Sequence, residues 1–229
     1  MTSPALDHAP MPAPDDSPMP SLRDLFGFPL RSPQSRRDIV VGGLLFLLVP
    51  FVGWALNLGH RYLVMRRVYR NESPYFRGFR PILETARASV IVMWGGLWYL
   101  GIAMTLLIPW VVGMRTTATL VLLVVGVVTF AMGLFLFPAA INTFVRDGNA
   151  TILHRPDRAF AHMRRAGRAY LWAWCVGAAA IALSCAAVVF LVVGFFIASA
   201  WAWSVIGVAF GCAMTPELRS RIALDGTGE

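Results

Sequence analysis

The chain contains no lysine, so all twenty of its basic residues are arginine. It also has little charge of any kind: 14% of its 229 residues are charged and 57% are hydrophobic. A soluble globular domain has about 25% charged and about 45–50% apolar residues, so this composition argues against an ordinary soluble domain. The net charge of +8 also fits a nucleic-acid-binding protein. However, the arginines gather in segments that flank long apolar runs, which is the arrangement that orients membrane proteins.

The sequence lacks the common catalytic and metal-binding patterns. It has no HExxH, no Gly-x-Ser-x-Gly and no phosphate-binding Gly-x4-Gly-Lys-Ser/Thr motif. Cys175, Cys185 and Cys212 lie in apolar runs without Cys-x2-Cys or Cys/His spacing, which indicates buried thiols rather than metal ligands. His154 and His162 have no paired base or nucleophile nearby in the sequence. We therefore expect no enzyme activity, no metal and no cofactor.

Four long stretches lack Asp, Glu, Lys and Arg. A helix needs roughly 20 apolar residues to cross the hydrocarbon core of a membrane. The longest stretch would reach about 72 Å as a single helix at about 1.5 Å per residue, so we expect it to fold back as a hairpin. The sequence thus predicts an all-α integral membrane bundle with four transmembrane helices and one further N-terminal segment. The four stretches are Ile39–His60, Ala88–Met114, Thr116–Val145 and Ala169–Pro216.

The N-terminal stretch, Ile39–His60, has arginines on both sides and Pro50 and Gly53 near its middle. Proline removes a backbone donor and glycine permits a tight turn. One interpretation is a re-entrant hairpin, with Ile39–Val49 entering and Trp54–Met65 leaving, and both ends in the cytoplasm. The other is a single kinked crossing, a fifth transmembrane segment, with the N-terminus outside. We favour the hairpin.

Two Arg-rich linkers, His60–Arg87 and residues 146–168, carry net charges of +5 and +4. The positive-inside rule places both linkers in the cytoplasm. Arg219 and Arg221 place the C-terminus there too. We therefore expect a multi-pass protein of the inner, cytoplasmic membrane.

Each linker ends in a segment with helical amphipathic spacing, Phe79–Arg87 and Phe160–Arg168, which predicts helices lying in the membrane plane. Because aromatic residues follow both segments, we expect an internal duplication with repeat-like units at 39–114 and 116–192 and a final helix at 195–216. Tryptophan and tyrosine favour the membrane–water interface. The predicted interfacial aromatics are Trp94, Trp98, Tyr99, Tyr170, Trp172 and Trp174.

The arginines of the linkers are the candidate site, because basic residues beside a membrane attract anionic lipid. A cytoplasmic protein is the other partner we consider, and no nucleic acid is expected. An alternative function is a permease or channel component for a small neutral or apolar solute, with Asn142, Thr129 or Ser184 lining its cavity. The candidate contact residues are Arg66, Arg67, Arg70, Arg80, Arg87, Arg158, Arg164, Arg165 and Arg168.

The remaining predictions concern the tails and helix packing. Residues 1–21 are Pro-rich and are expected to be disordered, and residues 217–229 form a short cytoplasmic tail. Leu22–Leu30 is either an in-plane anchor or part of a flexible tail. Gly207 and Gly211 permit close helix approach. We expect them to pack within the chain against Ala178, Ala182 and Ala186 of the preceding span, with dimerisation as the alternative.

Several of these features together resemble a family of uncharacterised polytopic membrane proteins of bacteria and archaea, one of the domain-of-unknown-function groups. The resemblance covers about residues 22–214, and implies a helical membrane fold with no established activity. The chain departs from the family pattern where Gly59 and Tyr62 are separated by two residues, and in lacking an Ile-Pro turn in its last hairpin. The matching residues are Arg36, Arg37, Gly42, Gly43, Pro50, Gly59, Tyr62, Arg66, Arg67, Asn71, Glu72, Pro74, Pro138, Asn142, Arg146, Asn149 and Phe160.

Overall fold

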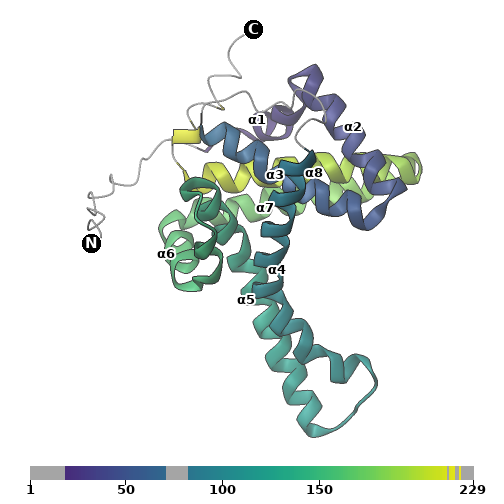
Figure 1. Cartoon of the computed structure of the whole chain (residues 1–229), viewed down its shortest axis with the longest axis vertical. Coiled ribbons are helices and arrows are strands. Elements are labelled where there is room, and N and C mark those ends of the chain that lie inside the picture. The colour runs from purple at the N-terminus through teal and green to yellow at the C-terminus, as the bar shows by residue number, and fades with distance from the viewer. Residues whose placement is uncertain (1–18, 71–81, 216, 220–221, 223–229) are drawn as a thin grey trace.

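A computed structural model of the chain describes residues 19–70, 82–215, 217–219 and 222, and every regular element in these ranges is a helix (Figure 1). The α-helices are α1 (Leu22–Gly27), α2 (Pro33–Leu48), α3 (Pro50–Tyr69), α4 (Ile82–Val111), α5 (Thr117–Asp147), α6 (Pro156–Ala166), α7 (Arg168–Ala186) and α8 (Leu191–Met214). Three short 3-10 helices connect them: η1 (Phe28–Leu30), η2 (Ala150–His154) and η3 (Ala187–Phe190).

Four of these helices are long and apolar enough to cross a membrane. Their candidate spans are Leu83–Val111, Thr117–Asp147, Arg168–Val189 and Val192–Met214. Each span exceeds the roughly 20 residues that a hydrocarbon core requires. For the described residues, the prediction of an all-helical fold with four membrane-length helices is confirmed. The helices α7 and α8 form the hairpin expected from the longest uncharged stretch.

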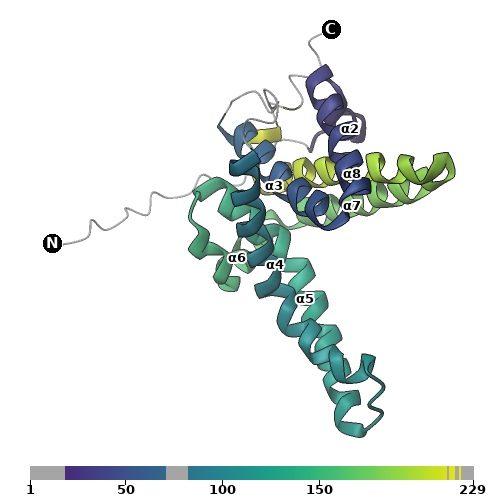
Figure 2. The same cartoon turned by 45° about the vertical axis from the view of Figure 1, so that its right-hand side comes forward.

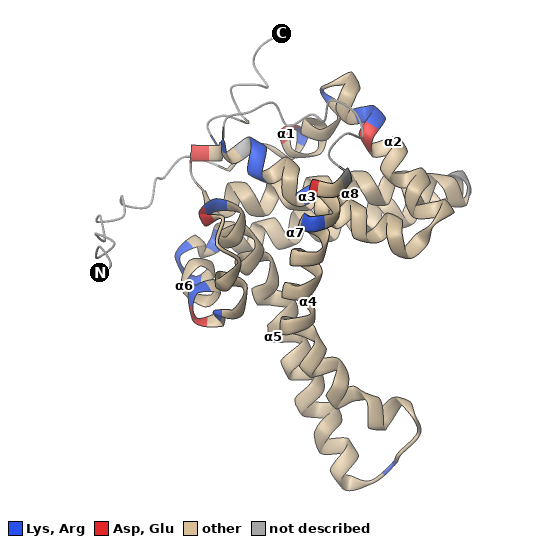
Figure 3. Ribbon diagram, in the orientation of Figure 1, with Lys and Arg blue, Asp and Glu red and all other residues tan. Residues whose placement is uncertain are grey.

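The four long helices form two apolar hairpins that diverge from a common base (Figures 1 and 2). The first arm is α4–α5 and the second is α7–α8. Figure 3 shows the charged residues around the base, on α6 and at the start of α2, whereas the first arm beyond its base carries charge only at its far turn. That turn contains Gly113 at φ +90°, and Thr116 then caps α5 through a reciprocal hydrogen-bonded pair with Thr119.

Four aromatic rings join the two arms at the base. Phe135 of the first arm stacks on Trp174 at 5.6 Å and meets Tyr170 edge-on at 5.4 Å. Phe210 of α8 lies 5.1 Å from Tyr170 and 5.5 Å from Trp174. The Tyr170 hydroxyl also donates to the carbonyl of Phe135. Because aromatic pairs add about 0.5–1.5 kcal/mol each beyond their buried area, this cluster holds α5 against α7 and α8.

The N-terminal apolar stretch is a helical hairpin. Val49, with φ −136° and ψ 76°, is non-helical and separates α2 from α3. The side-chain amide of Asn57 on α3 donates to the carbonyl of Gly42 on α2 at 2.9 Å and to that of Gly53 at 2.8 Å. The turn comes at Val49–Pro50, slightly before the predicted centre, and α3 continues unbroken past His60 to Tyr69.

The α2–α3 hairpin packs along α8. A Cβ atom added to Gly43 would lie 2.6 Å from the Cα of Ile197, and the rings of Phe46 and Phe196 meet edge-on at 4.9 Å. Gly207 and Gly211 do pack within the chain, but against Met65 of α3 rather than against α7. The expected partners on α7, which are Ala178, Ala182 and Ala186, face outward and are exposed.

The two predicted amphipathic segments have different local structures. α6 is a separate helix, because Gly167 at φ +51° interrupts the helical conformation before α7 begins. In contrast, Ile82–Arg87 is the first part of α4 and continues without a break to Val111, while Phe79–Pro81 lie outside the described residues. The duplication, its boundaries and an in-plane position of either segment therefore stay predictions.

The N-terminal segment docks on α8. Leu25 is fully buried and Phe28 is 7% exposed. The indole of Trp201 donates to the carbonyl of Phe26 at 3.1 Å, and the two rings meet edge-on at 5.4 Å. The segment Leu22–Leu30 is thus a helical element held by the protein rather than a flexible tail.

Candidate functional site

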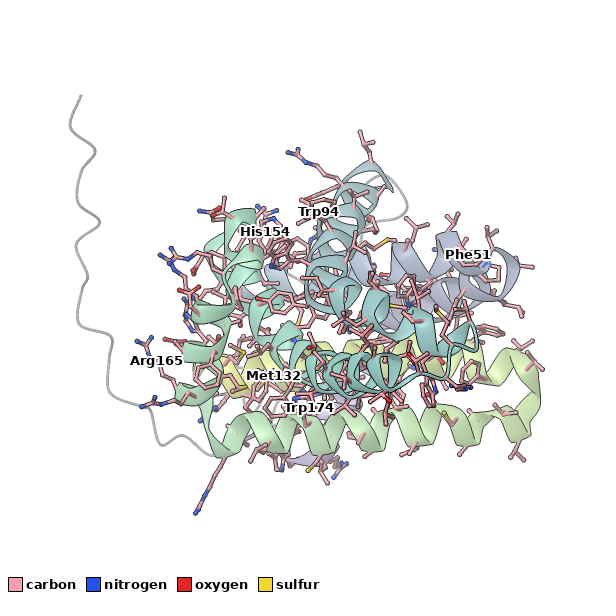
Figure 4. The ribbon with its side chains drawn as sticks, turned by 90° about the horizontal axis from the view of Figure 1, so that it is seen from below. Phe51, Trp94, Met132, His154, Arg165 and Trp174 are labelled. Carbon is pink, nitrogen blue, oxygen red and sulfur yellow. The ribbon has the colours of Figure 1, made fainter. Side chains whose placement is uncertain are left out.

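One side of α6 is a basic surface. Ala159, Met163 and Ala166 face the body of the protein and are buried or half-buried, and Ala159 is fully so. The opposite side exposes Phe160, which is 51% exposed, and in Figure 4 Arg165 projects away from the helices. We define the α6 basic surface by its exposed members Arg155, Arg158, Phe160, Arg164, Arg165 and Arg168.

Little acidic charge offsets this surface. The sequence of α6 contains one acidic residue, Asp157, which pairs with Arg155 at 3.1 Å while both side chains stay more than half exposed. Exposed ion pairs of this kind contribute about 0–1 kcal/mol. At the adjoining end of α5, Arg146 pairs with its neighbour Asp147 at 2.7 Å. The α6 basic surface thus keeps a positive balance.

His162 lies where α6 meets the end of α5. Its Nε2 atom is 3.5 Å from a guanidinium nitrogen of Arg146. Burial lowers the pKa of His162, and the positive charges of Arg146 and Arg165 lower it further. The imidazole is therefore neutral near pH 7, which allows it to lie beside these guanidinium groups.

η2, which lies in the second basic linker (residues 146–168), packs against α4 of the first arm (Figure 4). The indole nitrogen of Trp94 donates to His154 Nε2 at 3.2 Å, and the rings of Trp98 and His154 meet edge-on at 5.3 Å. The preceding Leu153 is 1% exposed, and its side chain lies 3.2 Å from where a Cβ of Gly95 would be. The sequence carries no signal for this contact, because the partners are separated by about 60 residues.

The predicted interfacial aromatics divide into two groups. Trp94 and Trp98 are exposed, as an interfacial position requires, and Trp172 and Trp174 are half-buried. Tyr99 and Tyr170 instead lie inside the protein, at 7% and 1% exposure. These two tyrosines therefore do not form part of the outer surface.

The arginines of the first linker do not join α6 in one described patch. Arg66 and Arg67 are half-buried near the end of α3, whereas Arg70 and Arg87 are exposed. Arg80 lies outside the described residues. The part of the basic site that the structure defines fully is the α6 basic surface.

A small cavity of about 20 Å³, lined by both polar and apolar residues, lies between η1, α2, α3 and α8. This volume is enough for about one water molecule. Ser204 lies near the middle of α8, 10 residues before Met214. Next to it, Trp203 stacks with Arg61, whose guanidinium carbon is 4.8 Å from the indole centre. The cavity is lined by Phe28, Pro29, Ser35, Asp38, Ile39, His60, Val64, Ser204 and Val208.

No local pattern in the sequence indicates this cavity. Its lining residues come from η1, α2, α3 and α8, so the first and the last of them are 180 residues apart, Phe28 and Val208. The residues expected to line a solute pathway do not take part. Asn142 donates to Pro138 and Ser184 to Ile181, each within its own helix, and Thr129 is half-buried on α5.

Within the described ranges, no three His, Cys, Asp or Glu side chains are grouped as metal ligands would be. No family model, curated protein or solved structure matches the chain.

Proposed function

We propose that the chain is a non-catalytic, multi-pass protein of the inner membrane, and that its α6 basic surface binds the headgroups of anionic phospholipids. The observation that carries this proposal is the set of exposed arginines around the exposed Phe160, at the base of two apolar arms (Figure 3). Arginine binds phosphate oxygens through two parallel hydrogen bonds, and an exposed phenylalanine suits the boundary between headgroups and acyl chains.

The packing of α6 against the protein determines which of its side chains can contact lipid. Since Ala159 and Met163 face the protein, α6 does not present a broad apolar face to lipid. Phe160 is the apolar group on the outward side, so the contact is mainly electrostatic. Each basic residue near an anionic membrane is worth about 1 kcal/mol, and salt screens the attraction.

In the topology we propose, both basic linkers and the C-terminus lie in the cytoplasm, and the α2–α3 hairpin enters the membrane from that side and returns. The tip of this hairpin is apolar, with Leu48 73% and Phe51 88% exposed, and Figure 4 shows Phe51 at one end of the molecule. The flanking Arg36 and Arg37 lie near the start of α2, at the other end of the hairpin. The hairpin packs on α8 through Gly43 and Phe46, whereas the turn at its tip is exposed.

The test uses purified full-length protein with equal amounts of phosphatidylglycerol and phosphatidylcholine, and native mass spectrometry to count bound lipids. We expect a preference for phosphatidylglycerol that falls several-fold in an Arg164→Glu/Arg168→Glu variant and weakens with added salt. Arg115→Glu is the matched control, because Arg115 is exposed at the far turn of the first arm. An unchanged preference in the double variant would contradict the proposal. Loss of a crosslink to a cytoplasmic protein in that variant would point to a protein partner instead.

A further inference from the structure

We infer that the segment Leu22–Leu30 is a lid over the cavity beside α8, and that its release admits water and small hydrophilic solutes to the middle of that helix. This inference goes beyond lipid binding and does not depend on it.

The cavity has walls of two kinds. Ser35, Asp38, His60 and Ser204 provide its polar groups, whereas Phe28 and Pro29 of the N-terminal segment provide part of its apolar wall. The hydroxyl of Ser204 donates to the carbonyl of Ala200 at 3.1 Å, so its oxygen lone pairs can accept a hydrogen bond. Water that enters the cavity can therefore donate a hydrogen bond to Ser204.

The segment is held by few anchors and cannot be a stable helix alone. α1 has six residues, far fewer than the roughly 12–15 that an isolated helix needs for marginal stability. Its docking depends on the buried side chains of Leu25 and Phe28, and on the hydrogen bond from Trp201. Arg31 adds a further tie, because it pairs with Asp24 and donates to the carbonyl of Ile222. Folding of α1 and docking on α8 are therefore coupled, so the segment leaves as one unit, as local unfolding units do.

The position of the cavity along α8 determines what the opening of the lid exposes. Ser204 lies 10 residues from the end of α8, which is about 15 Å at about 1.5 Å per residue. Since α8 is a candidate membrane span, an open lid hydrates a site near the middle of that span. Hydrophilic guests of about the size of water fit the cavity as it is.

The experiment measures how fast a membrane-impermeant, cationic methanethiosulfonate reagent modifies Ser204→Cys. The protein is the full chain in nanodiscs, with Cys175, Cys185 and Cys212 each replaced by alanine. We expect slow modification with the lid in place and at least a ten-fold faster reaction when Leu25→Ala is added. Leu22→Ala is the matched control on the same helix, because Leu22 is 55% exposed, and it should leave the rate unchanged.

A second cysteine separates lid opening from unfolding. Ser184 is buried on α7, away from the cavity lining, so Ser184→Cys should stay slow in the Leu25→Ala background. The inference is overturned if Leu25→Ala leaves the Ser204→Cys rate unchanged, if that rate is already fast with the lid intact, or if both cysteines become fast together.

Discussion

The guanidinium of Arg31, just before α2, donates a hydrogen bond to the backbone carbonyl of Ile222, beyond the end of α8, at 3.3 Å. The same guanidinium pairs with Asp24 of α1 at 2.9 Å. The two ends of the described chain therefore meet on one side of the molecule. This contact supports the proposed topology, in which four crossings and an α2–α3 hairpin that enters and returns leave both ends on one side of the membrane.

This topology predicts which positions are reachable from outside the cell. In a chain whose native cysteines are replaced by alanine, we expect Arg115→Cys to react with an impermeant maleimide on intact cells. Arg23→Cys and Thr151→Cys should react only after the cells are opened. All three positions are exposed on the protein, so a difference in labelling reports the membrane. Labelling of Arg23→Cys on intact cells would establish a single crossing by the first apolar stretch.

The contact between α2 and α8 predicts a large effect of one added methyl group. In Gly43→Ala the new Cβ would meet the Ile197 backbone at 2.6 Å, and backbone cannot move aside cheaply. We expect the variant to lose roughly 1–3 kcal/mol of stability through overpacking, measured as a lower midpoint of thermal unfolding in detergent. Gly27→Ala is the control, since nothing lies within 4 Å of its Cβ position. Equal midpoints for the two variants would mean that α2 does not pack on α8 this closely.

The hydrogen bond from Trp94 to His154 predicts measurable coupling between η2 and α4. A double-mutant cycle with Trp94→Phe and His154→Ala should give a coupling free energy of about 0.5–1.5 kcal/mol, the usual net value of one hydrogen bond. Thermal unfolding of the four proteins in one buffer provides the numbers. Strict additivity of the two single effects would show that the contact adds no stability.

His162 predicts a pH dependence of defined sign. Its pKa is lowered in the folded protein, so the unfolded chain binds the proton more readily and stability falls as pH drops below the ordinary value of about 6.5. Between pH 8 and pH 5 the native protein should lose more thermal stability than His162→Asn. A larger loss in His162→Asn than in the native chain would reverse the assigned direction.

The sequence predicted those parts of the fold whose local structure follows from a single physical rule. Long uncharged runs must satisfy their backbone hydrogen bonds internally when in lipid, which gave the four long helices. Pro50 and Gly53 marked the N-terminal hairpin. The turn itself falls at Val49, because proline disfavours the helical conformation for the residue before it.

Contacts between distant elements could not be predicted in this way. The cavity requires Phe28, His60 and Ser204 to meet, and no local pattern specifies that meeting. The amphipathic spacing of α6 has the same limit: an apolar stripe is equally consistent with burial in lipid or against a neighbouring helix. In this chain the apolar stripe that includes Ala159 and Met163 faces the protein. The sequence alone does not show that Phe160 instead points outward.

The contact between Phe46 and Phe196 has a consequence for biosynthesis. The ribosome makes the α2–α3 hairpin first, but its partner α8 is synthesised roughly 150 residues later, on the order of 10 s at usual elongation rates. During this interval the face of the hairpin that contains Gly42 and Gly43 has no α8 to cover it. The hairpin must therefore wait beside the translocation machinery or in the lipid, and its final seating is a late, post-translational step.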